Sequence, residues 1–308
     1  MNIAFASNSP FGAIIFKNLI KNGIKPSLLI TGLDKEKGKD QKVQALLIRD
    51  LAREENIKIE EAETKEDFHR IIEESSPEMV IVASFGIILK PETLTLSRFV
   101  NVHPSLLPKY RGATPIQSVI LNGDEKTGVS LIIMNDKIDQ GPIIAQSEVP
   151  LTPSIDYKEL EEALALEGVN LLLKNIPLVL KDEITPIPQN EDNATYTRLL
   201  TKADGKINWG ESAKMIERKV RAYNPWPGTY SKMGEKLFKV LETEVQEQTE
   251  AGPFGDLGKI YLGTNDTLAV QTGKDFLLIK KLQIEGKEST TSGDYLRGNM
   301  QAIGITLS

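Results

Sequence analysis

Short apolar runs and stretches of helical periodicity follow one another through the N-terminal part of the chain. The runs NIAFA, PSLLIT, MVIVA and FVNV contain few polar residues, which is typical of strands buried on both faces of a parallel sheet. They cover residues 2–6, 26–31, 79–83 and 99–102. Helical patterns lie between them, ending near residue 22 and covering residues 43–55 and 68–74.

Two further strands are predicted over residues 128–134 and 143–148, and a long helix over residues 157–181. Strands that alternate with helices favour a Rossmann-like α/β fold with a mostly parallel, open sheet. The turn after the first strand carries one glycine, Gly12, instead of the G-x-G-x-x-G pattern. The sequence therefore gives no support for a dinucleotide cofactor.

The pattern changes after residue 184. Residues 184–206 are rich in proline, asparagine and threonine, which indicates a linker. An amphipathic helix is predicted over residues 209–223, and the short strand-like pieces with glycine turns that follow are typical of a small, OB-like β-barrel. We expect an α/β domain over residues 1–184, a linker over 185–205 and a C-terminal domain over 206–308.

The composition excludes several kinds of site. Of the 308 residues, 40% are hydrophobic and 26% charged, which is ordinary for a globular protein with a substantial core. Because the chain has no cysteine, it cannot contain a disulfide, an iron–sulfur cluster, a zinc–thiolate site or a cysteine nucleophile. With only two histidines, His69 and His103, a histidine-based metal site is not expected either.

The sequence predicts no targeting segment. The apolar N-terminus lacks a basic region and reads as a strand rather than a signal peptide, and the longest apolar run, 79–89, is too short to cross a bilayer. We therefore expect a cytoplasmic protein without a membrane partner. The net charge of −6 gives no support for general affinity for nucleic acid, so such a partner would require a local basic patch.

Two polar residues stand at the end of the predicted strand 99–102. Asn101 and His103 are two positions apart, so their side chains point to the same face, and Pro104 ends the strand. Ligands of open α/β sheets bind at the carboxyl ends of the strands. A hydrogen-bond donor beside a titratable ring is a candidate for catalysis. The alternative is a histidine that only caps the strand edge.

The turn after the strand 128–134 carries two acids, Asp136 and Asp139, ahead of Gly141. Aspartate is common in turns because its side chain bonds to the local backbone, so the spacing alone favours a structural role for both. The other histidine, His69, lies in the polar helical stretch EDFHRIIEE and is interpreted as a solvent-exposed surface residue.

Several long motifs, in order along the chain, together resemble the folate-dependent formyltransferases. They are NVHPSLLPKYRGA from residue 101, PIQ from 115, NGD from 122, TGV from 127 and DQGPI from 139. ATYTRLLTKADGKINW and RAYNPWPGTY extend the resemblance into the second half, so that it covers nearly the whole chain. Within the family, the motifs are most similar to the branch that formylates methionyl initiator tRNA.

The resemblance implies a catalytic trio of Asn101, His103 and Asp139. The family transfers a formyl group from N10 of 10-formyltetrahydrofolate to an amine, here the amine of methionine on initiator tRNA, through a tetrahedral intermediate. Asn101 and His103 would donate to the developing oxyanion, where one donor contributes about 3 kcal/mol. Asp139 would accept the proton of the amine. The reaction requires neither a covalent enzyme intermediate nor a metal.

The resemblance also implies a folate site beside the trio. The loop after the strand 79–83 would line the folate pocket, and a plain βα loop with core hydrophobic residues is the alternative. The segment after His103 would form the rim of the site. The candidate folate residues are Phe85, Gly86, Ile88, Ser105, Leu106, Leu107 and Pro108.

Basic residues that could bind tRNA lie in three places. In the family, a loop corresponding to residues 33–42 usually carries an arginine between glycines, where this chain has Gly38-Lys39-Asp40 and loses the planar fork of arginine. Arg111 could meet a phosphate or position its own loop. The helix 209–223 places three cations on one face, in a domain with 14 Lys and Arg residues against 13 Asp and Glu. The candidates are Lys37, Lys39, Lys42, Arg111, Lys214, Arg218 and Arg221.

Two other functions remain open from the sequence. A sugar-nucleotide N-formyltransferase shares the trio on a similar N-terminal fold, although the lysine-rich insertion favours the tRNA branch. A non-catalytic folate- or RNA-binding protein is the second alternative, but binding alone would not require all three residue types of the trio. The family resemblance also implies a monomer.

Overall fold

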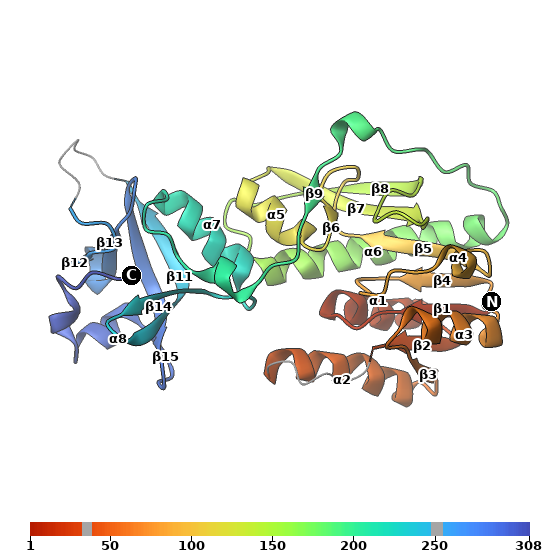
Figure 1. The fold of residues 1–308 in the computed structure, drawn as a ribbon, viewed down its shortest axis with the longest axis horizontal. Helices are drawn as coiled ribbons and strands as arrows, with labels where there is room; N and C mark the ends of the chain where they lie inside the picture. Colours follow the sequence, from red (N-terminus) through yellow and green to blue (C-terminus); the bar gives the residue numbers. More distant parts are fainter. Residues whose placement is uncertain (33–38, 248–254) are drawn as a thin grey trace. The chain divides into compact units, whose positions relative to one another are not determined.

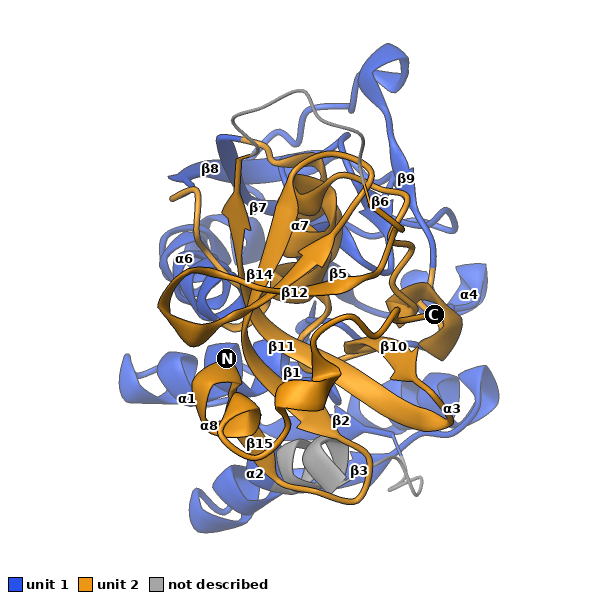
Figure 2. Ribbon diagram, turned by 90° about the vertical axis from the view of Figure 1, so that its left-hand side faces the viewer, with its two compact units in different colours: residues 1–115, 125–151, 159–198 blue, residues 116–124, 152–158, 199–308 orange. Residues whose placement is uncertain are grey.

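A computed structural model describes residues 1–32, 39–247 and 255–308, with the backbone alone for 39–46. The chain divides into two compact units (Figure 2). Unit 1 comprises residues 1–115, 125–151 and 159–198, and unit 2 comprises residues 116–124, 152–158 and 199–308.

Unit 1 is built on a seven-stranded sheet with the strand order β3-β2-β1-β4-β5-β7-β8 (Figure 1). The first five strands are parallel, and β7 and β8 extend the sheet antiparallel. This confirms the predicted mostly parallel, open α/β sheet. The strands are β1 (Ile3–Ala6), β2 (Leu28–Thr31), β3 (Lys58–Glu61), β4 (Met79–Val82), β5 (Arg98–His103), β7 (Lys126–Ile133) and β8 (Ile143–Pro150).

Helices cover both faces of this sheet, which explains why its central strands are apolar throughout. On one face, Phe5 of β1 contacts Phe16 of α1, and Val102 of β5 lies against Gly168 of α6. On the other face, Phe99 of β5 packs against Phe68 of α3. The helices are α1 (Pro10–Lys21), α2 (Lys39–Glu54), α3 (Lys65–Ser75), α4 (Pro91–Leu94), α5 (Pro115–Asn122) and α6 (Tyr157–Leu180).

Helix α6 has the length and apolar composition that would also suit a membrane span. Ten of its residues are buried within the structure, and Gly168 among them allows close approach of Val102. A core helix of a globular unit meets the same criteria of length and composition. The packing of α6 against the sheet accounts for its apolar surface.

The segment that follows α6 returns to the sheet of unit 1 and pairs with the loop after β5. Strand β9 (Tyr196–Thr197) runs parallel to β6 (Arg111–Gly112), and Ile187 exchanges two backbone hydrogen bonds with Ile143 of β8. Short 3-10 turns cover Glu191–Asn193 and Lys202–Gly205. Much of the predicted linker is therefore bound to unit 1. We call residues 187–197 the strap.

Unit 2 contains an antiparallel sheet with the order β10-β11-β14-β13-β12, and β15 pairs with β14. The C-terminal tail joins the two edges of this sheet, because Ser308 pairs with Lys232 of β10 while Leu307 donates to Gly258, just before β12. This closure fits the predicted small barrel. The elements are β10 (Thr229–Met233), β11 (Lys236–Gln246), β12 (Ile260–Leu262), β13 (Leu268–Gln271), β14 (Phe276–Ile284), β15 (Ser289–Thr291) and α8 (Ser292–Leu296), with 3-10 turns at Thr264–Asp266 and Met300–Ala302.

Helix α7 (Ala213–Tyr223) covers the core of this sheet with the apolar face predicted from the sequence. Ala213, Ile216 and Val220 are buried with Trp209, whose indole Nε1 donates to Ser231. The helix begins at Ala213 rather than at Trp209, because the hydroxyl of Ser212 caps it by accepting from the backbone N–H of Met215.

Three other elements differ from the sequence prediction. Helix α2 already begins at Lys39, inside the segment that we expected to be a polar loop. Strand β3 was not predicted, because it lies at the edge of the sheet and its sequence, KIEE, is largely polar. Helix α5 was not predicted either, since its eight residues are too few to display a helical period.

Candidate active site

Asn101 and His103 lie side by side at the carboxyl end of β5. Residue 101 is paired with Val82 of β4 and Ile132 of β7, so it occupies an interior position of the sheet. His103 is only 4% exposed, whereas Asn101 is partly exposed. The alternation along β5 turns Val100 and Val102 to the opposite face, where both are buried.

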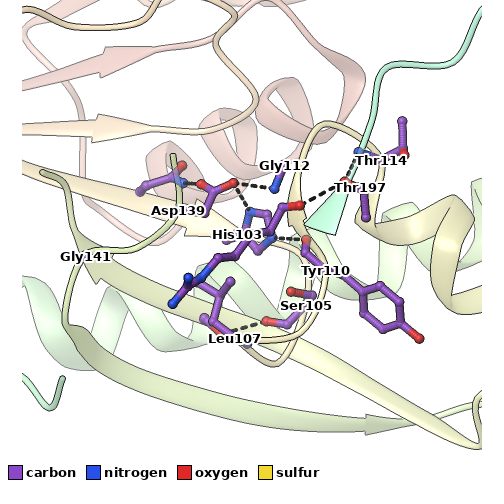
Figure 3. Close-up of polar contacts among 12 residues, drawn as sticks. His103, Ser105, Leu107, Tyr110, Gly112, Thr114, Asp139, Gly141 and Thr197 are labelled. Carbon is purple, nitrogen blue, oxygen red and sulfur yellow. Dashed lines mark hydrogen bonds and ion pairs between the residues drawn. The ribbon is translucent and has the colours of Figure 1, made fainter. Parts of the chain in front are cut away.

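Asp139 reaches both residues from the loop between β7 and β8, and Figure 3 shows it beside His103. Its Oδ1 accepts a hydrogen bond from the Asn101 amide at 3.1 Å, and its Oδ2 lies 3.6 Å from Nδ1 of His103. Oδ2 also accepts from the backbone N–H of Gly112 at 2.8 Å. The structure therefore brings together the three residues that the family resemblance implied as a trio.

The turn that carries Asp139 has an unusual backbone. Asp139 has a φ of 53°, a left-handed conformation that aspartate tolerates better than most residues. Two residues later, a Cβ on Gly141 would lie 1.7 Å from the carbonyl oxygen of Ile133, so only glycine fits. These two constraints direct the carboxylate of Asp139 back toward β5.

The loop after β5 fixes which side of the His103 ring faces Asp139. Nε2 lies 3.0 Å from the backbone carbonyl oxygen of Tyr110, which can only accept, so Nε2 carries a hydrogen. Nδ1 is therefore the ring atom directed at the carboxylate of Asp139. The backbone of one loop thus binds both groups: Tyr110 contacts the ring of His103, and Gly112 contacts the carboxylate of Asp139.

Arg111, which lies between these two residues, does not meet solvent. Its side chain is fully buried, and all five N–H groups of the guanidinium are hydrogen bonded. The acceptors are Gln189, Glu191 and Tyr196, all in the strap. This corrects the expectation that Arg111 binds tRNA: its donors are used within unit 1, where it positions the loop.

Comparison with known proteins identifies the family of the chain. Residues 1–176 match the model of the formyl transferase family, and residues 199–300 match that of the formyl transferase C-terminal domain. The chain belongs to the formyl transferase family. The resemblance inferred from the sequence motifs is thereby confirmed.

Curated relatives of this formyl transferase match over essentially its full length. The methionyl-tRNA formyltransferase of Desulforamulus reducens is 36% identical, over 100% of this chain and 98% of the relative. That of Clostridium acetobutylicum is 33% identical over 100% and 99%.

Among solved structures, HypX from Aquifex aeolicus in complex with tetrahydrofolic acid has a TM-score of 0.69 at 16% identity, covering 98% of this chain and 48% of that chain. The sugar 3N-formyl transferase WlaRD, solved with dTDP and 5-N-formyl-THF, has a TM-score of 0.65 at 20% identity, covering 94% and 99%. At these identities, the two structures show that the fold is shared.

The candidate folate residues of this formyl transferase lie in two loops that differ in exposure. In the loop after β4, Phe85 packs against Phe68 and is only partly exposed, while Ile88 is 67% exposed and Gly86 meets open space. Because Val82 is paired with Asn101, this loop begins beside the trio. The loop thus presents an apolar surface next to the polar groups of the trio.

The second candidate loop, from Ser105 to Pro108, is tightly bound to the sheet. The hydroxyl of Ser105 donates to the carbonyl oxygen of Lys109, and the N–H of Leu107 donates to the hydroxyl of Ser130. Gln146 of β8 donates to the carbonyl oxygen of Leu107. The side chains of Ser105 and Leu107 are buried, so Leu106 and Pro108 are the partly exposed members of this rim.

The basic candidates for tRNA binding have different outcomes. The side chains of Lys37, Lys39 and Lys42 lie outside the described residues. On α7, Arg218 donates to the carbonyl oxygens of Leu121 and Asn122, and Arg221 binds Glu217 and the carbonyl oxygen of Ile155. Lys214 is exposed, and no ion pair is found for it within the part of the chain that the structure describes. Of the three cations expected on one face of α7, Arg218 and Arg221 are therefore hydrogen bonded within unit 2.

The two other titratable candidates differ from each other. Asp136 is exposed in its turn, as its structural interpretation requires. His69 is only partly exposed, and its Nδ1 lies 2.8 Å from the hydroxyl of the fully buried Thr93. This corrects the interpretation of His69 as a solvated surface histidine.

Over residues 1–32, 47–247 and 255–308, no group of three or more potential metal ligands comes together.

Sequence reasoning missed the strap. Gln189 contacts the turn of Asp139, and Glu191 holds Arg111, although 50 and 80 positions separate these pairs along the chain. A proline- and asparagine-rich stretch has no period that could indicate a buried contact. The sequence allowed Arg111 to position its own loop, but it gave no indication of the residues that Arg111 would contact.

The pair of Arg111 and Glu191 predicts a dependence of stability on pH. Hydrogen bonding to the Arg111 guanidinium holds the pKa of Glu191 below its usual value. Because the folded pKa is depressed, the contribution of this pair is complete above the ordinary glutamate pKa of about 4.3 and is lost as the pH falls through the folded value.

The measurement is urea unfolding of the wild type and of Glu191→Gln at pH 7 and at pH 3, followed by circular dichroism. The wild type should be the more stable protein at pH 7, and the two should converge toward pH 3. An equal difference at both pH values would contradict the role of the Glu191 charge.

Proposed function

We propose that this chain transfers the formyl group of 10-formyltetrahydrofolate to the α-amine of methionine esterified to initiator tRNA. The observation that carries the proposal is the contact of Asp139 with both Asn101 and His103 in a chain whose full length matches methionyl-tRNA formyltransferases. The proposal places the protein in the cytoplasm, in the initiation step of protein synthesis.

Asn101, His103 and Asp139 would act as one unit at the formyl carbon. The donors for the oxygen on which negative charge develops would be the second N–H of the Asn101 amide and a proton on Nδ1 of His103, because Nε2 is held by Tyr110, and such a donor contributes about 3 kcal/mol. The carboxylate of Asp139 accepts the proton that the attacking amine loses, directly or through a water molecule. The bond between the formyl carbon and N10 then breaks, and N10 takes up a proton, so that tetrahydrofolate leaves. Its contacts with Asn101 and His103 align both donors before the substrate arrives.

Folate and tRNA would meet the chain on different elements. Phe85, Gly86 and Ile88 offer the pterin an apolar surface beside Asn101, and Leu106 and Pro108 form its rim. The α/β domain, proposed to extend to residue 184, carries the chemistry, and residues 206–308 contribute to tRNA binding. Lys214 is the cation of α7 best placed to contact a phosphate, and Lys37, Lys39 and Lys42 remain candidates from the sequence.

The test is formyl transfer from 10-formyltetrahydrofolate to methionyl initiator tRNA, followed by mass spectrometry of the released amino acid. A nucleotide-linked amino sugar serves as the parallel acceptor, and the His103→Ala variant as the catalytic control. We expect formylmethionine with the wild type and none with the variant. A formylated sugar instead would retain the chemistry and overturn the acceptor, and binding of folate or RNA without any product would overturn the reaction.

A further inference from the structure

We infer that Gln189 is a positioning residue for formyl transfer, through which the strap fixes the turn that carries Asp139. The inference rests on the proposed function, in which Asp139 takes part in the reaction. The side chain of Gln189 forms no hydrogen bond with the side chains of the trio. It acts on the backbone of the Asp139 turn and on Arg111.

The carboxamide of Gln189 is bonded at both of its ends. Its Nε2 donates to the carbonyl oxygens of Asp139 and Gly141, each at 2.8 Å. Its Oε1 accepts from Nε and Nη2 of Arg111 at 3.1 and 2.8 Å. Two donor hydrogens and two acceptor lone pairs are thus all used, which fixes the orientation of the amide.

Each end of this bridge binds a residue that belongs to the trio or lies next to residues that contact the trio. At the Nε2 end, the two carbonyl oxygens bracket the turn in which Asp139 holds its left-handed φ of 53°. At the Oε1 end, Arg111 is flanked by Tyr110, whose carbonyl oxygen accepts from His103, and by Gly112, whose N–H donates to Asp139. A displacement of Gln189 therefore changes the supports of both the ring and the carboxylate.

The strap is anchored independently on both sides of Gln189. Ile187 exchanges two backbone hydrogen bonds with Ile143, and Thr195 bonds to the carbonyl oxygen of Pro108 and the N–H of Arg111. The strap should therefore remain in place when the side chain of Gln189 is removed. What is lost is the support of the Asp139 turn, which is the property to be tested.

This arrangement predicts an effect on turnover rather than on substrate binding. A misplacement of catalytic groups by about 1 Å can reduce a rate by about 100-fold, because the reacting atoms no longer align. We expect Gln189→Leu to lower kcat by about tenfold or more and to leave both KM values within about threefold. A purely structural role would change the amount of folded protein and leave the kcat of that fraction unchanged.

A second variant separates the two ends of the bridge. Gln189→Glu keeps an acceptor for Arg111 but has no hydrogen to donate to the carbonyl oxygens of Asp139 and Gly141. If the Asp139 turn is the part that matters, this variant loses as much kcat as Gln189→Leu. The matched control is Gln283→Leu in unit 2, where the amide also donates to a backbone carbonyl oxygen, that of Lys287 at 2.9 Å.

NMR spectroscopy can detect a change in the surroundings of the His103 ring without measuring turnover. The chain has two histidines, so nitrogen–proton NMR resolves the ring of His103 with His69 as an internal reference. We expect the His103 ring signals to move in Gln189→Leu and to stay in Gln283→Leu, while those of His69 stay in both. Signals that do not move, together with a kcat equal to that of the control, would overturn the inference. If the wild type formylates neither acceptor, the proposed function fails, and the NMR comparison still decides whether Gln189 positions the site.

Discussion

Replacement of Asp139 by asparagine should lower kcat by about 1,000-fold, within the range that a positioned general base contributes. In the proposed reaction, the carboxylate of Asp139 takes the proton of the attacking amine. An asparagine amide of nearly the same size cannot accept that proton. It also cannot bind the ring of His103 and the amide of Asn101 in the same way, since one of its two ends is now a donor.

The backbone makes this substitution informative. Asp139 has a left-handed φ of 53°, a conformation that asparagine adopts as readily as aspartate. The side-chain oxygen of an asparagine can still accept from the N–H of Gly112. The turn should therefore keep its shape, and the loss should be one of chemistry rather than of folding.

The control for this prediction lies three residues away in the same turn. Asp136 is exposed, so Asp136→Asn removes one negative charge near the site without touching the trio. Single-turnover formyl transfer with saturating folate and methionyl-tRNA measures both variants. Equal rates for Asp136→Asn and Asp139→Asn would remove Asp139 from the chemistry.

The sequence predicted the sheet, and the shared orientation of Asn101 and His103, because both leave local signals. Central strands such as β1 and β4 are apolar throughout, since helices cover both of their faces. The alternation along β5 is enough to place Asn101 and His103 on one face. Asp139 was different, because its spacing alone indicated a turn residue and only the family resemblance gave it a role.

The strap could not be predicted, because the residues it contacts are distant along the chain and the strands that pair are very short. Strands β6 and β9 contain two residues each, 85 positions apart, and such pairs have no alternating pattern. The cations of α7 show the same limit. A helical wheel places Lys214, Arg218 and Arg221 on one face, but it cannot show that two of them bind carbonyl oxygens from residues 121, 122 and 155.

The structure also changes how Arg111 should respond to substitution. Arg111→Lys keeps the charge but should lower the free energy of unfolding by about 1–3 kcal/mol, the cost of leaving buried polar groups without partners. A lysine has three donors on one nitrogen and cannot serve Gln189, Glu191 and Tyr196 at five points. Glu191 is 63% exposed and can be hydrated, so most of the loss arises at Gln189 and Tyr196 and in burying the ammonium group.

Urea unfolding at pH 7 measures this loss. Circular dichroism is the appropriate signal, because both tryptophans, Trp209 and Trp226, lie in unit 2 and the strap lies in unit 1. Arg70→Lys is the matched control, since Arg70 forms an exposed pair with Glu74 on α3 and such pairs contribute little.

The dependence of tRNA affinity on salt concentration distinguishes a structural role of Arg111 from a contact with tRNA. It should have the same slope in Arg111→Lys as in the wild type, because a residue that touches no phosphate releases no counterion. A shallower slope with unchanged stability would instead place Arg111 on the tRNA.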